Sequence, residues 1–562
     1  MKTILKNGNV VNVFLDRIIR ADVMIEDDKI IAVGDCNDAT ADVVCDVSGK
    51  YVCPSFIDGH IHIESSMLQP AEFVRACLPH GTTTVIADPH EIANVSGLTG
   101  VEYMLEATED VPMNIYFMMP SCVPATPFDE AGASLSAEDI ASFYRYPRIL
   151  GLGEMMNYPG AVAGDKDVLR KIAVTRAAGK IVNGHAPMLH GSELDRYIAS
   201  GIYDDHECST IEEAEEKLNK GQWIMIRQGT AARNLEGLID LFDEPYSRRC
   251  LLVTDDKHPA DLLASGHIDS IIRQAAEKGK PVLTAIRMAT LQAAQHFGLR
   301  ELGAIAPGYV ADLLVLDDLE TVSVRDVYYK GNRVVTDGVS VEFPTRSVSE
   351  GVWKAVRNSF CLDALCREDF LVEPQDKACR VIRVIPDQLI TNEEIMKLDF
   401  SHSNGIDTDS DILKLAVIER HRNSGHIGLG YITGMGMKEG AIASSVSHDS
   451  HNLIVVGANE EDMAAAANCV REMSGGLAVV RNGQVLAKVA LPIGGLMGQE
   501  SAAEMAQQNA EVREAAATLG QTAGIDPFMN LAFVSLPVIP ALKMTTLGLI
   551  NVTEQKLVPL FV

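Results

Sequence analysis

A His-x-His pair at the end of a predicted strand is the clearest chemical signal in the sequence. His60 and His62 follow the apolar stretch 51–57 and an Asp-Gly step. Because side chains alternate along a strand, both imidazoles project to one side, while Ile61 and Ile63 pack on the other. Two neighbouring imidazoles supply half of a transition-metal site. Ordinary packing histidines are the alternative for this pair taken alone.

Further residues of the types that bind metals follow later predicted strands. Each is the polar residue directly past an apolar run, although any one of them alone is more often a hydrogen-bonded packing residue. The carboxyl ends of parallel barrel strands meet at one edge, where active sites lie. We therefore expect the polar side chains past these strands to gather at one edge, where they could bind metal: His60, His62, Glu154, His185, Asp204, Asp205, His206, Glu207, Asp255 and Asp256.

The elements that must position these residues are predicted to form a (β/α)8 barrel over residues 51–300. Helical stretches such as 70–78 and 168–178 separate the candidate strands, as parallel strands with crossovers require. A doubly wound sheet is the competing α/β architecture, but Gly151-Leu-Gly153-Glu-Met-Met156 lacks the third glycine of its fingerprint. The eight candidate strands are 51–57, 82–88, 113–119, 148–153, 180–184, 201–205, 222–227 and 250–255.

The barrel is predicted to be inserted in a small β domain and followed by a further domain. Residues 1–50 and 301–346 contain short strands punctuated by turn residues, and we expect the two segments to form one small β-sandwich domain. Residues 352–562 are expected to form a C-terminal domain of mixed α/β structure. There, His448 and His451 precede an apolar strand, in a polar loop aimed at a partner or in a turn that caps itself.

Size and composition limit the classes of function. A chain of 562 residues is too long for one core, and its 47% hydrophobic and 22% charged content is that of a folded soluble protein. The formal net charge of -29 argues against nucleic acid as a partner. The 11 cysteines form no Cys-x-x-Cys pair, and no window is apolar enough for a membrane span. We expect a cytoplasmic homo-oligomer, with a dimer favoured and no membrane partner.

Longer motifs run through essentially the whole chain. Pro54-x-x-Ile-Asp-x-His60-x-His62 and Gly308-x-x-Ala-Asp-Leu resemble the amidohydrolase superfamily. A further set is similar to its adenine deaminase branch: His62-Ile-Glu64-Ser-Ser, Asp88-Pro-His90-Glu91, Gly153-Glu154-Met-Met-Asn, Gly184-His185-Ala-Pro, Asp205-His206-Glu207, Asp255-Asp-Lys-His258-Pro and Ser447-His448-Asp-Ser-His451-Asn. Cys208 and Gln228 depart slightly from the expected pattern, which concerns substrate contacts and not the metal site.

The resemblance implies a pair of divalent cations, Mn2+ or Fe2+, with Zn2+ disfavoured. It assigns His60, His62 and Asp255 to one ion and His185 and His206 to the other. Glu154 would bridge them, at a position where the superfamily commonly has a carboxylated lysine. The implied reaction is hydrolytic deamination of adenine to hypoxanthine and ammonia in purine salvage. A water between the ions would act as hydroxide near neutral pH, and Asp255 would carry its proton to the departing amine.

The residue that protonates a purine ring nitrogen is left open by the sequence. The candidates are Glu64 and Glu207, if either is held protonated, His258, and the loop with His448 and His451. Arg227 could hold a ring acceptor, and Asp88 and His90 could shape the site or bind a further ion. For all of these residues, structural hydrogen bonding is an equal alternative.

Other functions fit the sequence less well. An amidohydrolase that opens a cyclic amide is the main alternative, but such enzymes usually have lysine where this chain has Glu154. The cytidine-deaminase type of zinc site requires Pro-Cys-x-x-Cys, which does not occur here. A non-catalytic scaffold would have lost ligands, whereas all six positions hold ligand-type residues.

Overall fold

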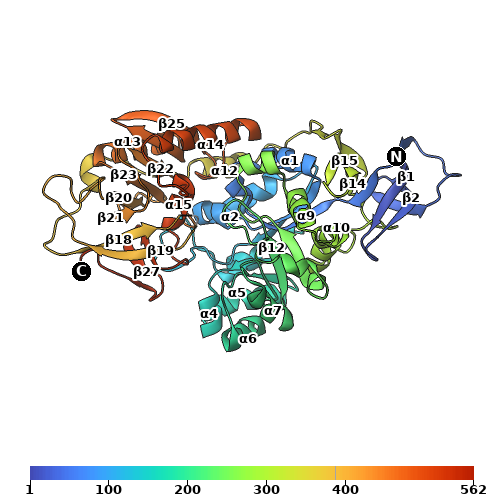
Figure 1. Cartoon of the computed structure of the whole chain (residues 1–562), viewed down its shortest axis with the longest axis horizontal. Helices are drawn as coiled ribbons and strands as arrows, with labels where there is room; N and C mark the ends of the chain where they lie inside the picture. The colour runs from blue at the N-terminus through green and yellow to red at the C-terminus, as the bar shows by residue number, and fades with distance from the viewer. Residues whose placement is uncertain (387) are drawn as a thin grey trace.

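The computed structural model of the protein describes residues 1–386 and 388–562, and it has three parts arranged along the long axis (Figure 1). The N-terminus lies in a β domain at one end, the C-terminus lies in a mixed α/β domain at the other end, and the barrel lies between them. None of the helices in the described residues is long and apolar enough to cross a membrane.

One sheet of nine strands is built from both ends of the first 346 residues. Its order is β17-β16-β15-β14-β5-β1-β2-β3, with β4 beside β1. The antiparallel pair β5–β14, in which Val52 lies opposite Val315, joins the two segments. The strands are β1 (Lys2–Asn12), β2 (Arg17–Glu26), β3 (Lys29–Gly34), β4 (Val43–Asp46), β5 (Tyr51–Pro54), β14 (Leu313–Asp318), β15 (Ser323–Tyr329), β16 (Asn332–Thr336) and β17 (Val339–Ser340).

The first expected barrel strand, 51–57, is divided between two sheets. The Ser55 N–H still donates to Asp312 O of the small sheet, whereas the Phe56 N–H donates to Gly81 O beside the next barrel strand. The change of hydrogen-bonding partner occurs between these two residues. The prediction of one continuous strand was therefore wrong, because apolar residues that enter either sheet look alike in sequence.

The barrel strands form two parallel groups, β10-β9-β8-β7-β6 and β11-β12-β13. A parallel bridge between Ile61 and Asp255 joins β6 to the end of β13. On the other side the Asp204 side chain accepts hydrogen bonds from Gly184 N (2.6 Å) and Asn183 Nδ2 (2.7 Å), which links β10 to β11. The strands are β6 (Phe56–Ile61), β7 (Thr82–Ala87), β8 (Asn114–Met119), β9 (Ile149–Met155), β10 (Ile181–Gly184), β11 (Asp204–Asp205), β12 (Trp223–Arg227) and β13 (Cys250–Val253).

Helices cover the barrel strands with apolar faces. In α9, Ile268, Ile271, Ile272 and Ala275 are buried, which is the i, i+3, i+4, i+7 spacing of one helix face. The helices of this part are α1 (Pro70–Cys77), α2 (His90–Ala107), α3 (Ala137–Phe143), α4 (Tyr158–Ala163), α5 (Lys166–Ala177), α6 (Gly191–Ser200), α7 (Ile211–Asn219), α8 (Pro259–Ser265), α9 (Ile268–Glu277), α10 (Val282–Arg287) and α11 (Ala293–His296).

The C-terminal domain contains a sheet of eight strands and a smaller one of three. The orders are β19-β18-β21-β20-β23-β22-β24-β25 and β26-β27-β28. The strands are β18 (Cys379–Val384), β19 (Thr391–Met396), β20 (Leu413–Ile418), β21 (Ile427–Thr433), β22 (Ala441–Ser444), β23 (Leu453–Gly457), β24 (Gly476–Arg481), β25 (Gln484–Ala490), β26 (Leu542–Thr545), β27 (Gly548–Asn551) and β28 (Lys556–Leu557). The helices are α12 (Glu350–Arg357), α13 (Glu460–Glu472), α14 (Ala502–Ala517) and α15 (Pro527–Val534).

The C-terminal domain packs directly on the barrel. Gly498 N donates to Met67 O at 2.9 Å, and one continuous cluster of buried apolar residues contains Met67 of the barrel and Met505 of α14. The segment after β25 and helix α14 therefore contact the segment that follows β6.

Candidate active site

Strand β6 brings the His-x-His pair to the edge of the barrel. All six residues of β6 are buried, and Gly59 makes this possible, since a Cβ there would lie 2.3 Å from Leu251 Cδ1 of β13. His60 is 1% exposed and His62, directly after the strand, is 3% exposed. His62 Nδ1 donates to Asp88 O at 2.9 Å, which leaves the lone pair of Nε2 free to face the site.

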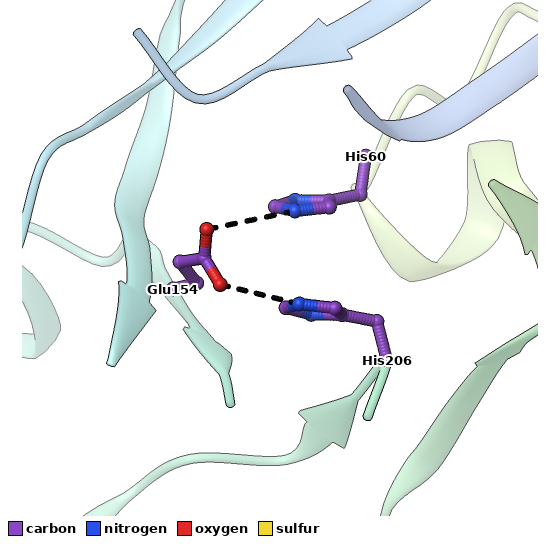
Figure 2. A group of neighbouring side chains, drawn as sticks. All are labelled: His60, Glu154 and His206. Carbon is purple, nitrogen blue, oxygen red and sulfur yellow. Dashed lines mark ion pairs between the residues drawn. The ribbon is translucent and has the colours of Figure 1, made fainter. Parts of the chain in front are cut away.

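Glu154 of β9 lies between two pairs of histidines. Its Oε1 is 3.3 Å from His62 Nε2 and 3.9 Å from His60 Nε2. Its Oε2 is 2.7 Å from His185 Nδ1 and 3.2 Å from His206 Nε2. Figure 2 shows the two oxygens turned toward His60 and His206, respectively. One carboxylate thus contacts both halves of the predicted metal centre.

Asp255 completes the group from the end of β13. Its backbone has φ 59°, in the left-handed region that is uncommon for residues other than glycine. The Asp255 N–H donates to His60 O at 2.9 Å. Its Oδ1 lies 3.2 Å from His62 Nε2, and its Oδ2 accepts from Arg227 Nη1 at 2.8 Å. All six predicted ligands are therefore gathered at one place.

The donor atoms fit divalent cations. His60 Nε2 is buried and has no hydrogen-bond partner among the described residues, and an unpaired buried polar atom is costly without a ligand. The donor atoms of His60, His62 and Asp255 lie within 4.8 Å of one another, as do those of His60, Glu154 and His206. Burial alone would raise the pKa of the Glu154 and Asp255 carboxyl groups. Neighbouring histidines hold both pKa values well below the usual range, and Arg227 contributes to the lowering at Asp255. Two anions and four imidazoles suit Mn2+, Fe2+ or Zn2+.

Glu207 and Arg227 form an ion pair beside the predicted ligands. Arg227 Nη2 donates to Glu207 Oε2 at 2.8 Å, while its Nη1 bridges Glu207 and Asp255. Burial would raise the pKa of Glu207, but the guanidinium lowers it far below the usual value. Glu207 is thus a carboxylate and not the protonated donor that the sequence allowed. Arg227, which the sequence allowed either to hold a ring acceptor or to form structural hydrogen bonds, has the carboxylates of Glu207 and Asp255 as its partners.

Glu64 and His258 differ in their ability to donate a proton. Glu64 is 2% exposed, its Oε1 accepts from Ile92 N at 3.2 Å, and its Oε2 has no partner in the described part of the chain. Burial raises the pKa of Glu64 to about 7. His258 Nδ1 accepts from Arg513 Nη2 at 2.9 Å, and burial with this cation lowers its pKa to about 4. Glu64 is therefore partly protonated near neutral pH and can act as an acid, whereas His258 is a neutral imidazole.

Asp88 and His90, which follow β7, contact the predicted metal ligands Glu154 and His62. Asp88 Oδ2 accepts from Glu154 N at 2.9 Å. The close approach requires Gly153, because a Cβ there would lie 2.1 Å from the same oxygen. The His90 ring lies 4.5 Å from the His62 ring, and its Nδ1 is 3.5 Å from Glu154 Oε1.

His448 and His451 come from the C-terminal domain, and both contact Glu91 at the start of α2. His448 Nδ1 lies 2.7 Å from Glu91 Oε1, and His451 Nε2 contacts Glu91 Oε2. Glu91 and Asp449 were not among the predicted site residues. The available signal was the position of Glu91 in Asp-Pro-His-Glu directly after the second barrel strand, and that of Asp449 between the two histidines.

Comparison with known proteins covers the whole chain. The amidohydrolase family profile matches residues 51–334, and the profile of the adenine deaminase C-terminal domain matches residues 388–556. Adenine deaminase 2 of Carboxydothermus hydrogenoformans is 45% identical over 559 residues, which cover 99% of this chain and 96% of that protein. Adenine deaminase of Desulfatibacillum aliphaticivorans is 46% identical over 561 residues, covering 99% and 97%.

Among solved structures, a β-aspartyl dipeptidase of Fervidobacterium islandicum AW-1 matches with 20% sequence identity and a TM-score of 0.49. The match covers 61% of this chain and 100% of that chain.

Proposed function

Because the chain belongs to the adenine deaminase family of amidohydrolases, we propose that the residues around Glu154 carry out its hydrolytic reaction. The enzyme is a hydrolase that converts adenine and water to hypoxanthine and ammonia. The observation that carries the assignment of the site is the position of Glu154, whose two oxygens face separate histidine pairs.

The proposed metal centre has two divalent cations. His60, His62 and Asp255 would hold one, His185 and His206 would hold the other, and Glu154 would contact both. Mn2+ or Fe2+ is favoured over Zn2+. When bound, the cations supply the Lewis acidity that makes water available as hydroxide near neutral pH.

The protein's own groups move the protons. Asp255 takes a proton from the attacking water at Oδ1, since Arg227 occupies its Oδ2, and returns it to the departing amine. Glu64 donates a proton to a ring nitrogen as negative charge develops there, since its pKa near 7 keeps it partly protonated. The water oxygen forms a bond to C6, the C6–N bond breaks and ammonia leaves. The remaining proton of that oxygen returns to Glu64, so hypoxanthine is left with its C6=O group and both carboxyl groups regain their starting state.

Ammonia release tests this proposal. The purified enzyme is treated with a chelator, and turnover is measured on adenine, other purines and cyclic amides before and after Mn2+, Fe2+ or Zn2+ is added. We expect chelation to abolish adenine turnover and Mn2+ or Fe2+ to restore it, with two metal equivalents bound per chain. The variant Glu439→Gln, an exposed change in the C-terminal domain, is the control and should respond to the chelator and to the added metals as the wild type does. Full activity of the metal-free protein would refute the proposed centre.

The assembly and location of the enzyme stay predictions. We expect a homo-oligomer, with a dimer favoured, since the acidic surface and large apolar fraction permit one. We also expect a cytoplasmic location, since the 11 cysteines show no pattern of disulfide pairs. Static light scattering of the metal-loaded enzyme would give twice the mass of one chain for a dimer and the mass of one chain for a monomer.

A further inference from the structure

A buried segment of the C-terminal domain, residues 447–452, lies against the proposed active site and is held by hydrogen bonds from its own domain and from Glu130 of the barrel part. Arg420, which is fully buried, donates to His451 O and, at 2.8 Å, to Gly494 O. His421 Nε2 donates to Ser450 O at 2.8 Å. Asn452 Nδ2 donates to Glu130 O at 2.7 Å. These contacts fix the backbone, so the side chains of the segment point in set directions.

Glu91 of the barrel holds the same segment from the opposite side. The Ser447 N–H donates to His451 Nδ1 at 3.2 Å, so a neutral His451 carries its proton on Nε2 and donates it to Glu91. His448 Nδ1 donates to the other oxygen of Glu91 at 2.7 Å. Because His451 Nε2 is a hydrogen-bond donor here, these three residues form a clamp between domains and not a third cation site.

Asp449 lies between the two clamped histidines and has an unused acceptor. Its side chain is buried at 3% exposure, and Oδ2 has no hydrogen-bond partner among the described residues. Burial raises the pKa of Asp449 to about 6, which leaves it a carboxylate above neutral pH. A buried carboxylate oxygen without a donor is costly, so the site favours a ligand that brings an N–H group.

His90 contacts both Asp449 and Glu154. His90 lies between them, with Nδ1 3.5 Å from Glu154 Oε1 and Nε2 3.9 Å from Asp449 Oδ1. Asp449 is therefore one imidazole ring removed from the proposed centre. When C6 and the amino group of adenine lie at that centre, the five-membered ring of the purine extends away from it, and this ring carries the N–H group.

We propose that Asp449 accepts a hydrogen bond from the N9–H of adenine, and that Glu91 acts as a positioning residue that holds Asp449 there through His448 and His451. The inference rests on the proposed function, because it takes C6 of adenine to lie near Glu154. It also makes Asp449 a specificity determinant for the free base. A substituent on N9 removes the donor and collides with the carboxylate, which leaves a buried charge unpaired.

Selectivity between adenine and 9-methyladenine tests the contact. We expect the wild-type enzyme to prefer adenine by about 1000-fold or more in kcat/KM, as sites built around a substrate N–H do. Asp449→Ala should lower kcat/KM for adenine about 10- to 100-fold, mainly through KM, and should narrow the preference to within about 10-fold. The preference of Asp449→Asn, which keeps the shape and one acceptor, should fall between those of the wild type and of Asp449→Ala. Asp399→Ala, an exposed change in the same domain, should match wild type.

Glu91→Gln tests the clamp through the same ratio, kcat/KM for adenine over kcat/KM for 9-methyladenine. It should weaken the preference for adenine over 9-methyladenine while two metal equivalents stay bound, an effect that a loss of stability alone does not produce. An unchanged ratio in Asp449→Ala and Asp449→Asn, with metal content intact, would overturn the proposal. If Asp449→Ala does not fold, the isosteric Asp449→Asn decides.

Binding of purine, which has the N9–H but no amino group, separates this proposal from the proposed function. Calorimetry needs no turnover. Tight binding of purine, weak binding of 9-methylpurine and a smaller difference in Asp449→Asn would support the contact even if adenine were not deaminated. Equal affinities of the wild-type enzyme for both compounds would refute the contact even if adenine were deaminated.

Discussion

Asp88 Oδ2 accepts a hydrogen bond from the backbone N–H of Glu154, with 2.9 Å between oxygen and nitrogen. Asp88 follows β7 and Glu154 lies in β9, and β8 lies between these two strands in the sheet. The hydrogen bond fixes the peptide that carries the central carboxylate of the site. It depends on Gly153, whose missing side chain leaves room for the Asp88 carboxylate. Gly153, which has no side chain, thus helps to determine where the two oxygens of Glu154 point.

Gly153→Ala tests this dependence. The new Cβ would lie 2.1 Å from Asp88 Oδ2, so the carboxylate must move away from Glu154 N. We expect adenine turnover to fall at least about 100-fold, since small displacements of reacting groups have effects of that size. Metal content, measured by elemental analysis, should fall below two per chain. Gly351→Ala, where a Cβ meets nothing within 4 Å, is the control. Normal turnover in Gly153→Ala would show that the contact is dispensable.

Glu154→Gln tests the two-sided contact. The amide keeps the size of the side chain but offers one oxygen and one NH2 group, and the NH2 group cannot bind a cation. We expect about one metal equivalent to be lost and turnover to fall by about 100- to 10,000-fold, the range for a lost catalytic group. Elemental analysis and ammonia release measure the two effects. Two tightly bound equivalents and normal turnover would contradict the role of Glu154.

Asp255→Asn tests the proton transfer. The substitution removes the basic oxygen that faces His62 and the anionic partner of Arg227. Turnover should fall about 100- to 10,000-fold, while the circular dichroism spectrum stays that of the wild type. Residual activity within about tenfold of wild type would exclude Asp255 as the proton acceptor. Asp376→Asn, an exposed change, serves as the control.

Asp129 gives a prediction for stability against pH. Burial raises its pKa to about 7 in the folded protein, from the ordinary value of 3.8 that it has in the unfolded chain. Between these two values the folded chain holds a proton that the unfolded chain has lost, so stability falls as the pH rises through this window and is level above it. The full loss amounts to about 4 kcal/mol at most.

Asp129→Asn removes this titration. The midpoint of thermal unfolding should fall less between pH 5 and pH 8 in Asp129→Asn than in the wild-type enzyme. The surface variant Asp376→Asn should follow the wild type. An equal fall in Asp129→Asn would mean that Asp129 has no raised pKa in the folded state.

Predictions from the sequence were most accurate where a local pattern governs the structure. Strands such as β7 and β12 lie within a residue of the expected ranges, because apolar runs with polar ends mark buried parallel strands. The stretch 51–57 was misassigned because its hydrogen-bonding partners change between Ser55 and Phe56. The apolar composition of a segment does not determine which of two sheets it joins.

Protonation states could not be read from the sequence. Glu64 and Glu207 were equal candidates for a proton donor, since both are glutamates in motifs beside histidines. The structure pairs Glu207 with Arg227 and leaves Glu64 buried with a free oxygen. A carboxyl group's pKa depends on neighbours in space, and those neighbours come from other strands.

The sequence by itself determined the kinds of ligand and their order along the chain: His60 and His62 first, Glu154 next, and Asp255 last. Alternation along a strand and the common edge of parallel strands predict that these residues gather, and the resemblance to the amidohydrolases selects them as ligands. Only the tertiary structure decided that Glu91 contacts His448, 357 residues later, and that Asp449 faces the barrel. Docking of two domains depends on the shape of both surfaces, and such a fit leaves no periodic pattern in either segment.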